Sequence, residues 1–179
     1  MGVNFTKQIV DCLYTGISTD TGCFRYTNTT ADTFRIAASL VELGCNSAYI
    51  NKVMFETKSK EKIMLEREVY DTITYCADGK CAIVWVTLDM LKSLNIGEDE
   101  IEGLASIPRQ IEGVLIGITM KEKEGGFFKI SVRTNGDIDA AKFCSKFGGG
   151  GHKAAAGCSI NGSLEDVRSQ LIKAAEETL

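Results

Sequence analysis

The sequence predicts an α/β protein in which helices cover a mixed β-sheet. Segments rich in apolar and β-branched residues, such as 80–87 and 127–134, alternate with segments of helical periodicity, such as 163–175. A Glu-Gly-Gly turn at 124–126 joins two strands and is typical of an antiparallel hairpin. The composition, with 44% hydrophobic and 25% charged residues among 179, is that of a globular protein. One hairpin among interleaved helices favours a mixed sheet over a parallel one.

The chain opens with a segment of ambiguous periodicity. Residues 3–13 are compatible with a helix, although no clear start signal precedes them. Residues 13–26 predict a short strand, apolar and β-branched, that ends in a polar turn built around Asp20. Ligand and metal groups of α/β proteins usually lie at such strand ends, so Asp20 is a candidate metal ligand. The alternative is that Asp20 closes an Asx-turn.

Helices are expected next. The run Thr29-Thr30-Ala31-Asp32 has the form of a capping box and predicts an amphipathic helix that Gly44 ends. A second short helix is expected over 47–55. Residues 58–78 then predict a long, largely solvated helix that connects two domains, because most of its residues are charged and its apolar residues recur on one face. That face carries Ile63, Tyr70, Ile73 and Ala77.

Residues 79–179 are expected to form the sheet domain. The only proline, Pro108, separates a helical part from a hairpin. The expected strands are 80–87, 113–121, 127–134 and 157–160, and the expected helices are 88–94, 99–106, 137–147 and one that Ser163 caps. Asp137-Ile138-Asp139 resembles a paired-carboxylate metal motif, but Asp137 stands where a helix cap belongs, and we favour the cap.

The charge and cysteine content exclude several classes of protein. A net charge of −4 and a pI near 5.1 exclude a broadly basic, nucleic-acid-coating surface, so a nucleotide site must be a local pocket suited to small substrates. The seven cysteines contain no C-x-x-C pair, which predicts free thiols and a cytoplasmic protein. One histidine and scattered cysteines make a zinc site improbable. No apolar run approaches the ~20 residues of a membrane span.

The glycine tract formed by Gly148, Gly149, Gly150 and Gly151 is the strongest functional signal, and it precedes His152 and Lys153. Glycine lets another molecule approach the main chain, so four in succession indicate a geometric requirement. Their N–H groups are expected to converge on a phosphate, and a helix beginning near His152 would add its positive end. A flexible hinge is the alternative, but the tract lies between two well-patterned elements.

Two arginines are candidates to join His152 and Lys153 at this site. Arg133 ends a predicted strand, and Arg109 follows Pro108. A guanidinium group holds phosphate through a planar, two-pronged fork. Arg133 is the stronger candidate, and a solvated surface charge is the alternative for both.

The run GGGGHKAAAG, preceded by KISVRTNGDIDAAKFCSKF, resembles the DHH-associated C-terminal domain of DHH-family phosphoesterases. LYTGISTDTGCFRYTNTT is similar to the last conserved segment of the catalytic DHH domain, in the branch of nanoRNases that also dephosphorylate 3′-phosphoadenosine 5′-phosphate. The resemblance covers nearly the whole chain. It implies that residues 1–57 are the C-terminal part of a catalytic domain, 58–78 a connector helix and 79–179 a substrate-binding domain.

The resemblance also implies roles for individual residues. In this family the catalytic domain binds two Mn²⁺ ions through aspartates and histidines, and the last aspartate ligand matches Asp20. The glycine tract and His152 hold the substrate, assisted by Arg133. This chain departs from the family because it has no Asp-His-His triplet and no histidine besides His152. A two-metal hydrolase needs both ions held, so we expect the chain to be a C-terminal piece that is inactive alone.

The leading hypothesis is therefore a fragment of a Mn²⁺-dependent phosphoesterase acting on short RNA or nucleoside bisphosphates. The partner is a short RNA or nucleotide substrate, the sequence allows a homodimer, and no membrane partner is expected. A non-catalytic nucleotide- or RNA-binding module is the rival from another class, because similar domains accompany alanyl-tRNA synthetases. Cleavage of cyclic dinucleotides is a third hypothesis for the function.

Overall fold

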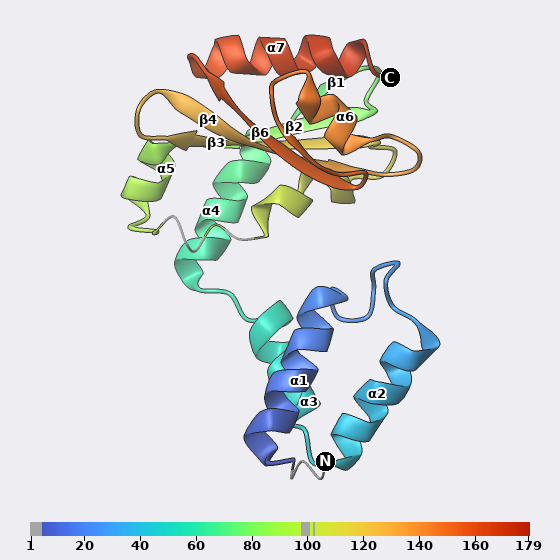
Figure 1. Ribbon diagram of the computed structural model, residues 1–179. Helices are drawn as coiled ribbons and strands as arrows, with labels where there is room; N and C mark the ends of the chain where they lie inside the picture. Colours follow the sequence, from blue (N-terminus) through green and yellow to red (C-terminus); the bar gives the residue numbers. More distant parts are fainter. Residues whose placement is uncertain (1–4, 98–100, 102) are drawn as a thin grey trace. The chain divides into compact units, whose positions relative to one another are not determined.

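The computed structural model describes residues 5–97, 101 and 103–179, which form two compact units, Met1–Lys58 and Ser59–Leu179. The first unit is helical and the second is built on one sheet (Figure 1). No helix in these described ranges has the length and apolar character needed to cross a bilayer.

Three helices form the first unit: α1 (Lys7–Asp20), α2 (Ala31–Glu42) and α3 (Ser47–Asn51), the last continued by a π-helical turn at Lys52–Glu56. The predicted helix that follows the Thr29–Asp32 capping run and ends at Gly44 is confirmed, as is the helix predicted over 47–55. Thr30 caps α2 through a capping box with Thr33, and Gly44 follows its end at φ +92°. The core of the unit consists of Val10, Tyr14, Ala37, Leu40, Cys45 and Ile50.

The predicted strand over 13–26 is wrong, because α1 continues through Asp20 and a turn follows. Val10, Tyr14 and Ser18 recur every four residues and are buried, which is helical spacing. The threonines that suggested a strand instead donate to the helix backbone, as Thr19 Oγ1 does to the Thr15 carbonyl at 2.8 Å. Asp20 therefore ends a helix and not a strand.

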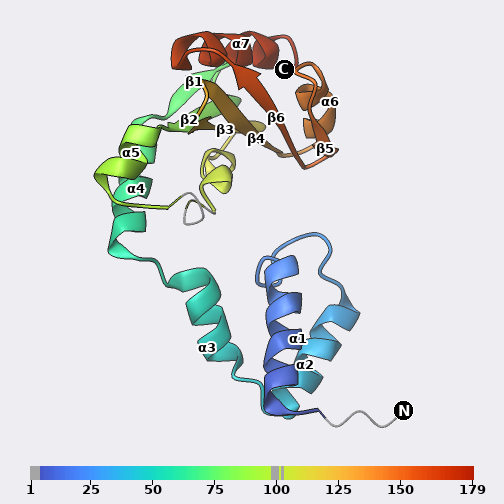
Figure 2. The ribbon, with the colours of Figure 1, turned by 60° about the vertical axis from the view of Figure 1, so that its left-hand side comes forward.

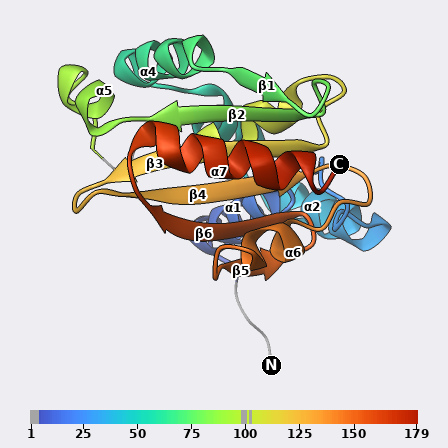
Figure 3. The same cartoon turned by 90° about the horizontal axis from the view of Figure 1, so that it is seen from above.

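A six-stranded sheet organises the second unit, in the order β1-β2-β3-β4-β6-β5. Strands β2 and β3 are parallel, and every other neighbouring pair is antiparallel, so the mixed sheet is confirmed (Figure 3). The strands are β1 (Thr74–Cys76), β2 (Cys81–Val86), β3 (Ile116–Lys123), β4 (Phe127–Thr134), β5 (Gly150–His152) and β6 (Ala155–Asn161).

Helices cover the two faces of this sheet unequally. Helices α6 (Ala140–Ser145) and α7 (Leu164–Glu176) cover one face and pack on side chains from β2, β3, β4 and β6. On the other face lie α4 (Lys60–Asp71), α5 (Leu88–Ser93) and the short 3₁₀ turns η3 (Leu104–Ser106) and η4 (Pro108–Gln110) (Figure 2). Their core with β2 consists of Leu65, Val69, Val84, Val86, Leu91, Ile96, Ile101, Leu104 and Ile107.

The second face is therefore covered over β2 and β3, and η3 also contacts β4, but the face is open over the rest of β4 and over β6. Val84 and Thr119 on this face are buried, whereas Lys129 and Ser159 are exposed and Arg133 is half-buried. These residues share the face because side chains alternate along a strand and paired residues lie side by side. The unit thus leaves half of one sheet face available to a ligand.

The predicted helix over 58–78 is wrong in its second half. Helix α4 ends at Asp71, and β1 follows as an edge strand that a turn at 77–79 joins to β2. The predicted inner face is also wrong, because Ile63 and Tyr70 are exposed while Leu65 and Val69 are buried against β2. Helix α4 therefore packs on the sheet of the second unit.

Other boundaries differ by a few residues. Helix α6 begins after Asp139, whose side chain accepts from the Lys142 amide, so Asp139 and not Asp137 is the cap. The cap of α7 at Ser163 and the turn at 124–126 are confirmed. Of the helix predicted over 99–106, residues 99, 100 and 102 lie outside the described residues, and η3 occupies its end.

Candidate functional site

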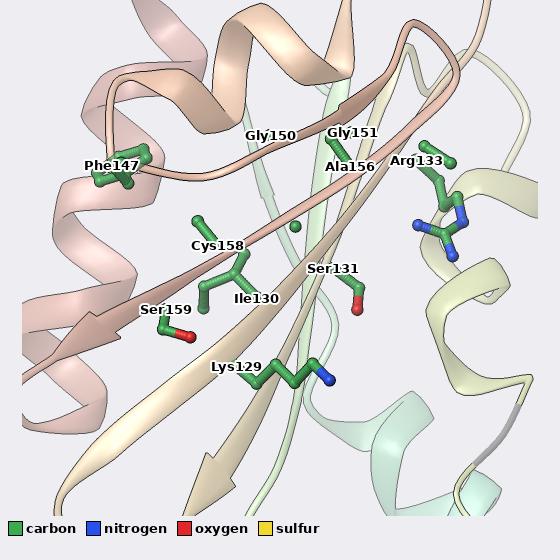
Figure 4. A pocket seen from close by; sticks show the side chains of 13 residues that line it. Lys129, Ile130, Ser131, Arg133, Phe147, Gly150, Gly151, Ala156, Cys158 and Ser159 are labelled. Carbon is green, nitrogen blue, oxygen red and sulfur yellow. The ribbon is translucent and has the colours of Figure 1, made fainter.

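A pocket of about 660 Å³ lies where the glycine tract meets the open half of the sheet. Figure 4 shows it from close by, with Gly150 and Gly151 on one side and Arg133, Ser131 and Lys129 following one another along β4. The lining residues are Lys129, Ile130, Ser131, Arg133, Phe147, Gly148, Gly150, Gly151, Ala155, Ala156, Gly157, Cys158 and Ser159.

The first two glycines of the tract end helix α6. Gly148 adopts φ +71°, its N–H donates to the Ser145 carbonyl, and the Gly149 N–H donates to the Cys144 carbonyl at 3.0 Å. This is the Schellman arrangement, which satisfies the last carbonyls of a helix. Two of the four glycine amides therefore already donate hydrogen bonds to carbonyls of α6. The negative end of the α6 dipole also points toward the tract. The predicted convergence of all four amides on a phosphate is wrong.

The last two glycines form β5, so the helix predicted to begin near His152 is also wrong. Strand β5 lies at the sheet edge, where N–H groups alternate between the neighbouring strand and the outside. A Cβ on Gly151 would lie 2.6 Å from the Ala155 carbonyl oxygen, whereas one on Gly150 would meet nothing within 4 Å. Gly151 thus lets β5 approach β6, and Gly150 leaves bare backbone beside the pocket.

Arg133 reaches the pocket from the end of β4. It is half-buried, and its Nη1 donates to the Val132 carbonyl at 3.0 Å. Its cross-strand neighbours are Gly117 on β3 and Ala155 on β6, which are both small. The structure therefore brings Arg133 together with Gly148, Gly150 and Gly151, as the sequence predicted.

His152 and Lys153 are exposed and do not line this pocket. His152 ends β5, and the Lys153 amino group lies 3.3 Å from a carboxylate oxygen of Asp137. The Lys153 carbonyl accepts from the Thr134 hydroxyl at 2.9 Å, which fixes the turn to the end of β4. The two residues therefore lie next to the pocket in sequence but not in its wall.

Arg109 does not line the pocket either. It belongs to η4, and its carbonyl accepts from the Asn135 side chain at 3.2 Å. Its backbone packs so closely on Gly117 that a Cβ there would lie 2.7 Å from the Arg109 nitrogen. The described contacts of Arg109 are therefore made by its backbone, with Gly117 of β3 and with Asn135 after the end of β4.

Sequence reasoning missed Lys129, Ser131 and Ser159 as pocket residues. The signal was present in β4, where buried Phe128, Ile130 and Val132 alternate with these polar residues and Arg133. Such alternation indicates a strand with one open face. The sequence predicts the strand, but the alternation alone does not identify a ligand for its polar face.

Asp20 lies in the first unit, where it is exposed, and its Oδ2 accepts from the Asn28 side chain at 3.0 Å. Within the described part of the chain, no three His, Cys, Asp or Glu residues come together as a group that could hold a metal ion. A pair of catalytic ions needs several carboxylate or imidazole ligands. The described residues do not fit a complete Mn²⁺ site, and Asp20 offers one carboxylate.

All seven cysteines are free, as predicted. Cys144 and Cys158 lie close together under the glycine tract, and the hydrogen bond to Cys158, together with burial, raises the pKa of the Cys144 thiol. A raised pKa keeps the thiol protonated and unreactive at neutral pH. Cys144 is therefore part of the packing and not a nucleophile, whereas the same hydrogen bond lowers the pKa of the buried Cys158 thiol.

The fold and the pocket define a mixed-sheet binding domain, and comparison with known proteins identifies its family. Residues 78–179 match the DHHA1 domain, so this chain belongs to the DHHA1 domain family. The resemblance to the C-terminal part of DHH-family phosphoesterases is confirmed.

Several relatives are named as bifunctional oligoribonucleases and PAP phosphatases. The chain is 31% identical to the bifunctional oligoribonuclease and PAP phosphatase NrnA of Thermus thermophilus, over 100% of this chain and 53% of the relative. It is 25% identical to NrnA of Bacillus subtilis, over 89% of this chain and 50% of the relative. A crystal structure of an exopolyphosphatase-related protein from Bacteroides fragilis matches with a TM-score of 0.86 at 26% identity, covering 96% and 52% of the two chains. The chain thus spans about half the length of these relatives.

Proposed function

We propose that this chain is the substrate-binding part of a phosphoesterase that hydrolyses short oligoribonucleotides or nucleoside 3′,5′-bisphosphates. The names of its relatives, which are oligoribonucleases and PAP phosphatases, support this substrate class. The single observation that carries the proposal is that Arg133 and the backbone of Gly150 line the same pocket.

The chemistry of the pocket suits a phosphate group. The guanidinium of Arg133 can donate two parallel hydrogen bonds to phosphate oxygens. Because Gly150 has no side chain, a ligand can approach the main chain of β5 closely. The hydroxyl groups of Ser131 and Ser159 offer neutral partners for a sugar or a phosphate.

The size and charge of the site favour a small substrate. A volume of about 660 Å³ lies within the range of pockets for small molecules and nucleotides. The net charge of −4 disfavours binding of a long polyanion, because unpaired acidic groups elsewhere would repel its phosphates. A short nucleotide exposes few phosphates beyond the pocket.

We further propose that Asp20 supplies one ligand to Mn²⁺ and that the other ligands come from residues outside these 179. The first unit supports this view, because large apolar side chains such as Phe34, Ile36 and Tyr49 are about half exposed or more. Such a surface is typical of a face that more protein covers. The proposal predicts that the 179-residue chain has no phosphoesterase activity alone.

Nucleotide binding by the 179-residue chain tests the pocket. Isothermal titration with adenosine 3′,5′-bisphosphate should show at least a tenfold loss of affinity for Arg133→Ala, because a charged hydrogen-bond donor is lost. Arg67→Ala is the matched control, because Arg67 is exposed on α4 and its substitution removes the same positive charge away from the pocket. Wild-type affinity in Arg133→Ala would overturn the proposed site.

The role of Asp20 needs a longer protein that contains this chain. Asp20→Asn should abolish Mn²⁺-dependent turnover of a diribonucleotide there while leaving substrate binding unchanged, because a metal ligand is lost and the pocket is not. Full turnover by Asp20→Asn would favour a role for this chain in binding alone.

A further inference from the structure

The open half of the sheet continues past Arg133 to a lysine that the proposed phosphate site does not use. Lys129 lies on β4 and lines the same pocket, on the same face as Ser131 and Arg133. At about 3.3 Å per residue, the two cationic positions are roughly 13 Å apart along the strand. Figure 4 shows the polar ends of all three side chains on one side of β4.

No partner within the described ranges accounts for the Lys129 ammonium group. Its cross-strand neighbours are Lys121 on β3 and Ser159 on β6. The Lys121 amino group lies 3.5 Å from the Ile101 carbonyl, toward the covered half of the face. Among the described residues no carboxylate lies within ion-pair distance of Lys129. Its ammonium group therefore lies on the open half of the sheet face, in the pocket that Ser131 and Ser159 also line.

We propose that Lys129 forms a second anion subsite and that a short single-stranded oligoribonucleotide lies along β4, with one phosphate at Arg133 and a later one at Lys129. This inference rests on the proposed function. Two phosphates roughly 13 Å apart are about four steps apart at the 3.4 Å rise of a helical strand and fewer steps apart in an extended strand, so an extended tetranucleotide with a 5′-phosphate spans both positions. A mononucleotide therefore engages one end only, and affinity rises with length until the second phosphate reaches Lys129.

Binding of a length series tests this subsite. The 179-residue chain is titrated with 5′-phosphorylated oligoadenylates of one to five nucleotides, as wild type, Lys129→Ala and Lys173→Ala. Lys173 is the matched control, because it is exposed on α7, over the opposite face. Lys129→Ala should weaken binding of the tetranucleotide roughly five- to tenfold more than binding of the mononucleotide, with Lys173→Ala equal to wild type.

Salt dependence gives a second readout. Loss of one phosphate contact should lower the slope of log K against log salt concentration by about 0.7 for a single-stranded ligand. That change is expected for the tetranucleotide and not for the mononucleotide.

The outcomes separate the subsite from the proposed function. Equal effects of Lys129→Ala on the mononucleotide and the tetranucleotide, or no effect on either, overturn the subsite while the Arg133 site stands. A wild-type chain that binds neither ligand, or an Arg133→Ala chain that binds both normally, overturns the proposed function and the subsite with it. Circular dichroism checks that each variant is folded.

Discussion

Gly149 and Gly150 are neighbours in the tract, but the structure gives them opposite tolerance to a methyl group. A Cβ on Gly149 would lie 2.8 Å from the Cα of Cys158 and closer still to the Gly157 carbonyl oxygen. Both obstacles belong to β6, in the interior of the sheet, so they cannot move aside cheaply. A Cβ on Gly150 meets nothing within 4 Å, and its φ is not positive.

The expected cost of Gly149→Ala follows from this clash. Forcing one methyl group into a packed contact costs about 1–3 kcal/mol, and at roughly 4 °C per kcal/mol the melting temperature should fall by roughly 4–12 °C. Gly150→Ala should be neutral or stabilising by up to about 1 kcal/mol, because alanine has less conformational entropy to lose. The assay is thermal unfolding of both variants by circular dichroism and calorimetry.

The two variants should also separate fold from function. Gly150 pairs with Gly157, so a methyl group on either projects over the open half of the sheet. Gly150→Ala should therefore keep its melting temperature and still lose nucleotide affinity, by about threefold or more. If Gly149→Ala melts like wild type, or if Gly150→Ala is the less stable of the two, our account of the tract is wrong.

Two further predictions concern residues near the pocket. Asp139→Ala should lower the free energy of unfolding by about 1 kcal/mol, because the cap of α6 is lost. Asp137→Ala removes only an exposed ion pair and should change the free energy of unfolding by less than about 0.5 kcal/mol. Urea unfolding measures both values, and equal effects would contradict the cap assignment. The exposed Cys12 should react with iodoacetamide at neutral pH, whereas Cys144 should resist until well above the pH at which a free thiol ionises, because its hydrogen bond to Cys158 and its burial raise its pKa. Mass spectrometry of labelled peptides measures both rates, and rapid labelling of native Cys144 would refute the second prediction.

The sequence predicted elements well where pattern and cap agree. Helix α7 combines a serine cap with buried Val167 and Leu171 at helical spacing, and the Glu-Gly-Gly turn defines the hairpin of β3 and β4. The prediction from sequence was wrong where the strand propensity of the residues and the helical spacing of the buried positions disagree. In α1 the β-branched residues favour a strand, but burial of Val10, Tyr14 and Ser18 determines the outcome, which only the tertiary packing reveals.

The pocket could be predicted only in part. Glycine content identified the tract, and a strand end identified Arg133, because both signals are local. The division of the tract into a helix end and an edge strand depends on the hydrogen bond from Gly149 to Cys144 and on the pairing with β6, and neither is visible in four identical letters. Lys129 belongs to the pocket only because the covering elements leave its part of β4 exposed.

The parallel pair β2 and β3 has a consequence for how this surface can change. Two parallel neighbours need a long crossover, and here α5, η3 and η4, which lie between β2 and β3 in the chain, help to cover the adjoining half of one face. The antiparallel strands that follow need only a hairpin or a return over the opposite face, so the described helices of this unit leave most of β4 and β6 uncovered on this face. Insertions or deletions within 87–115 would thus change how far the crossover extends over the open half of the sheet without altering a residue that lines the pocket, which makes crossover length a means of tuning how long a ligand the domain accommodates.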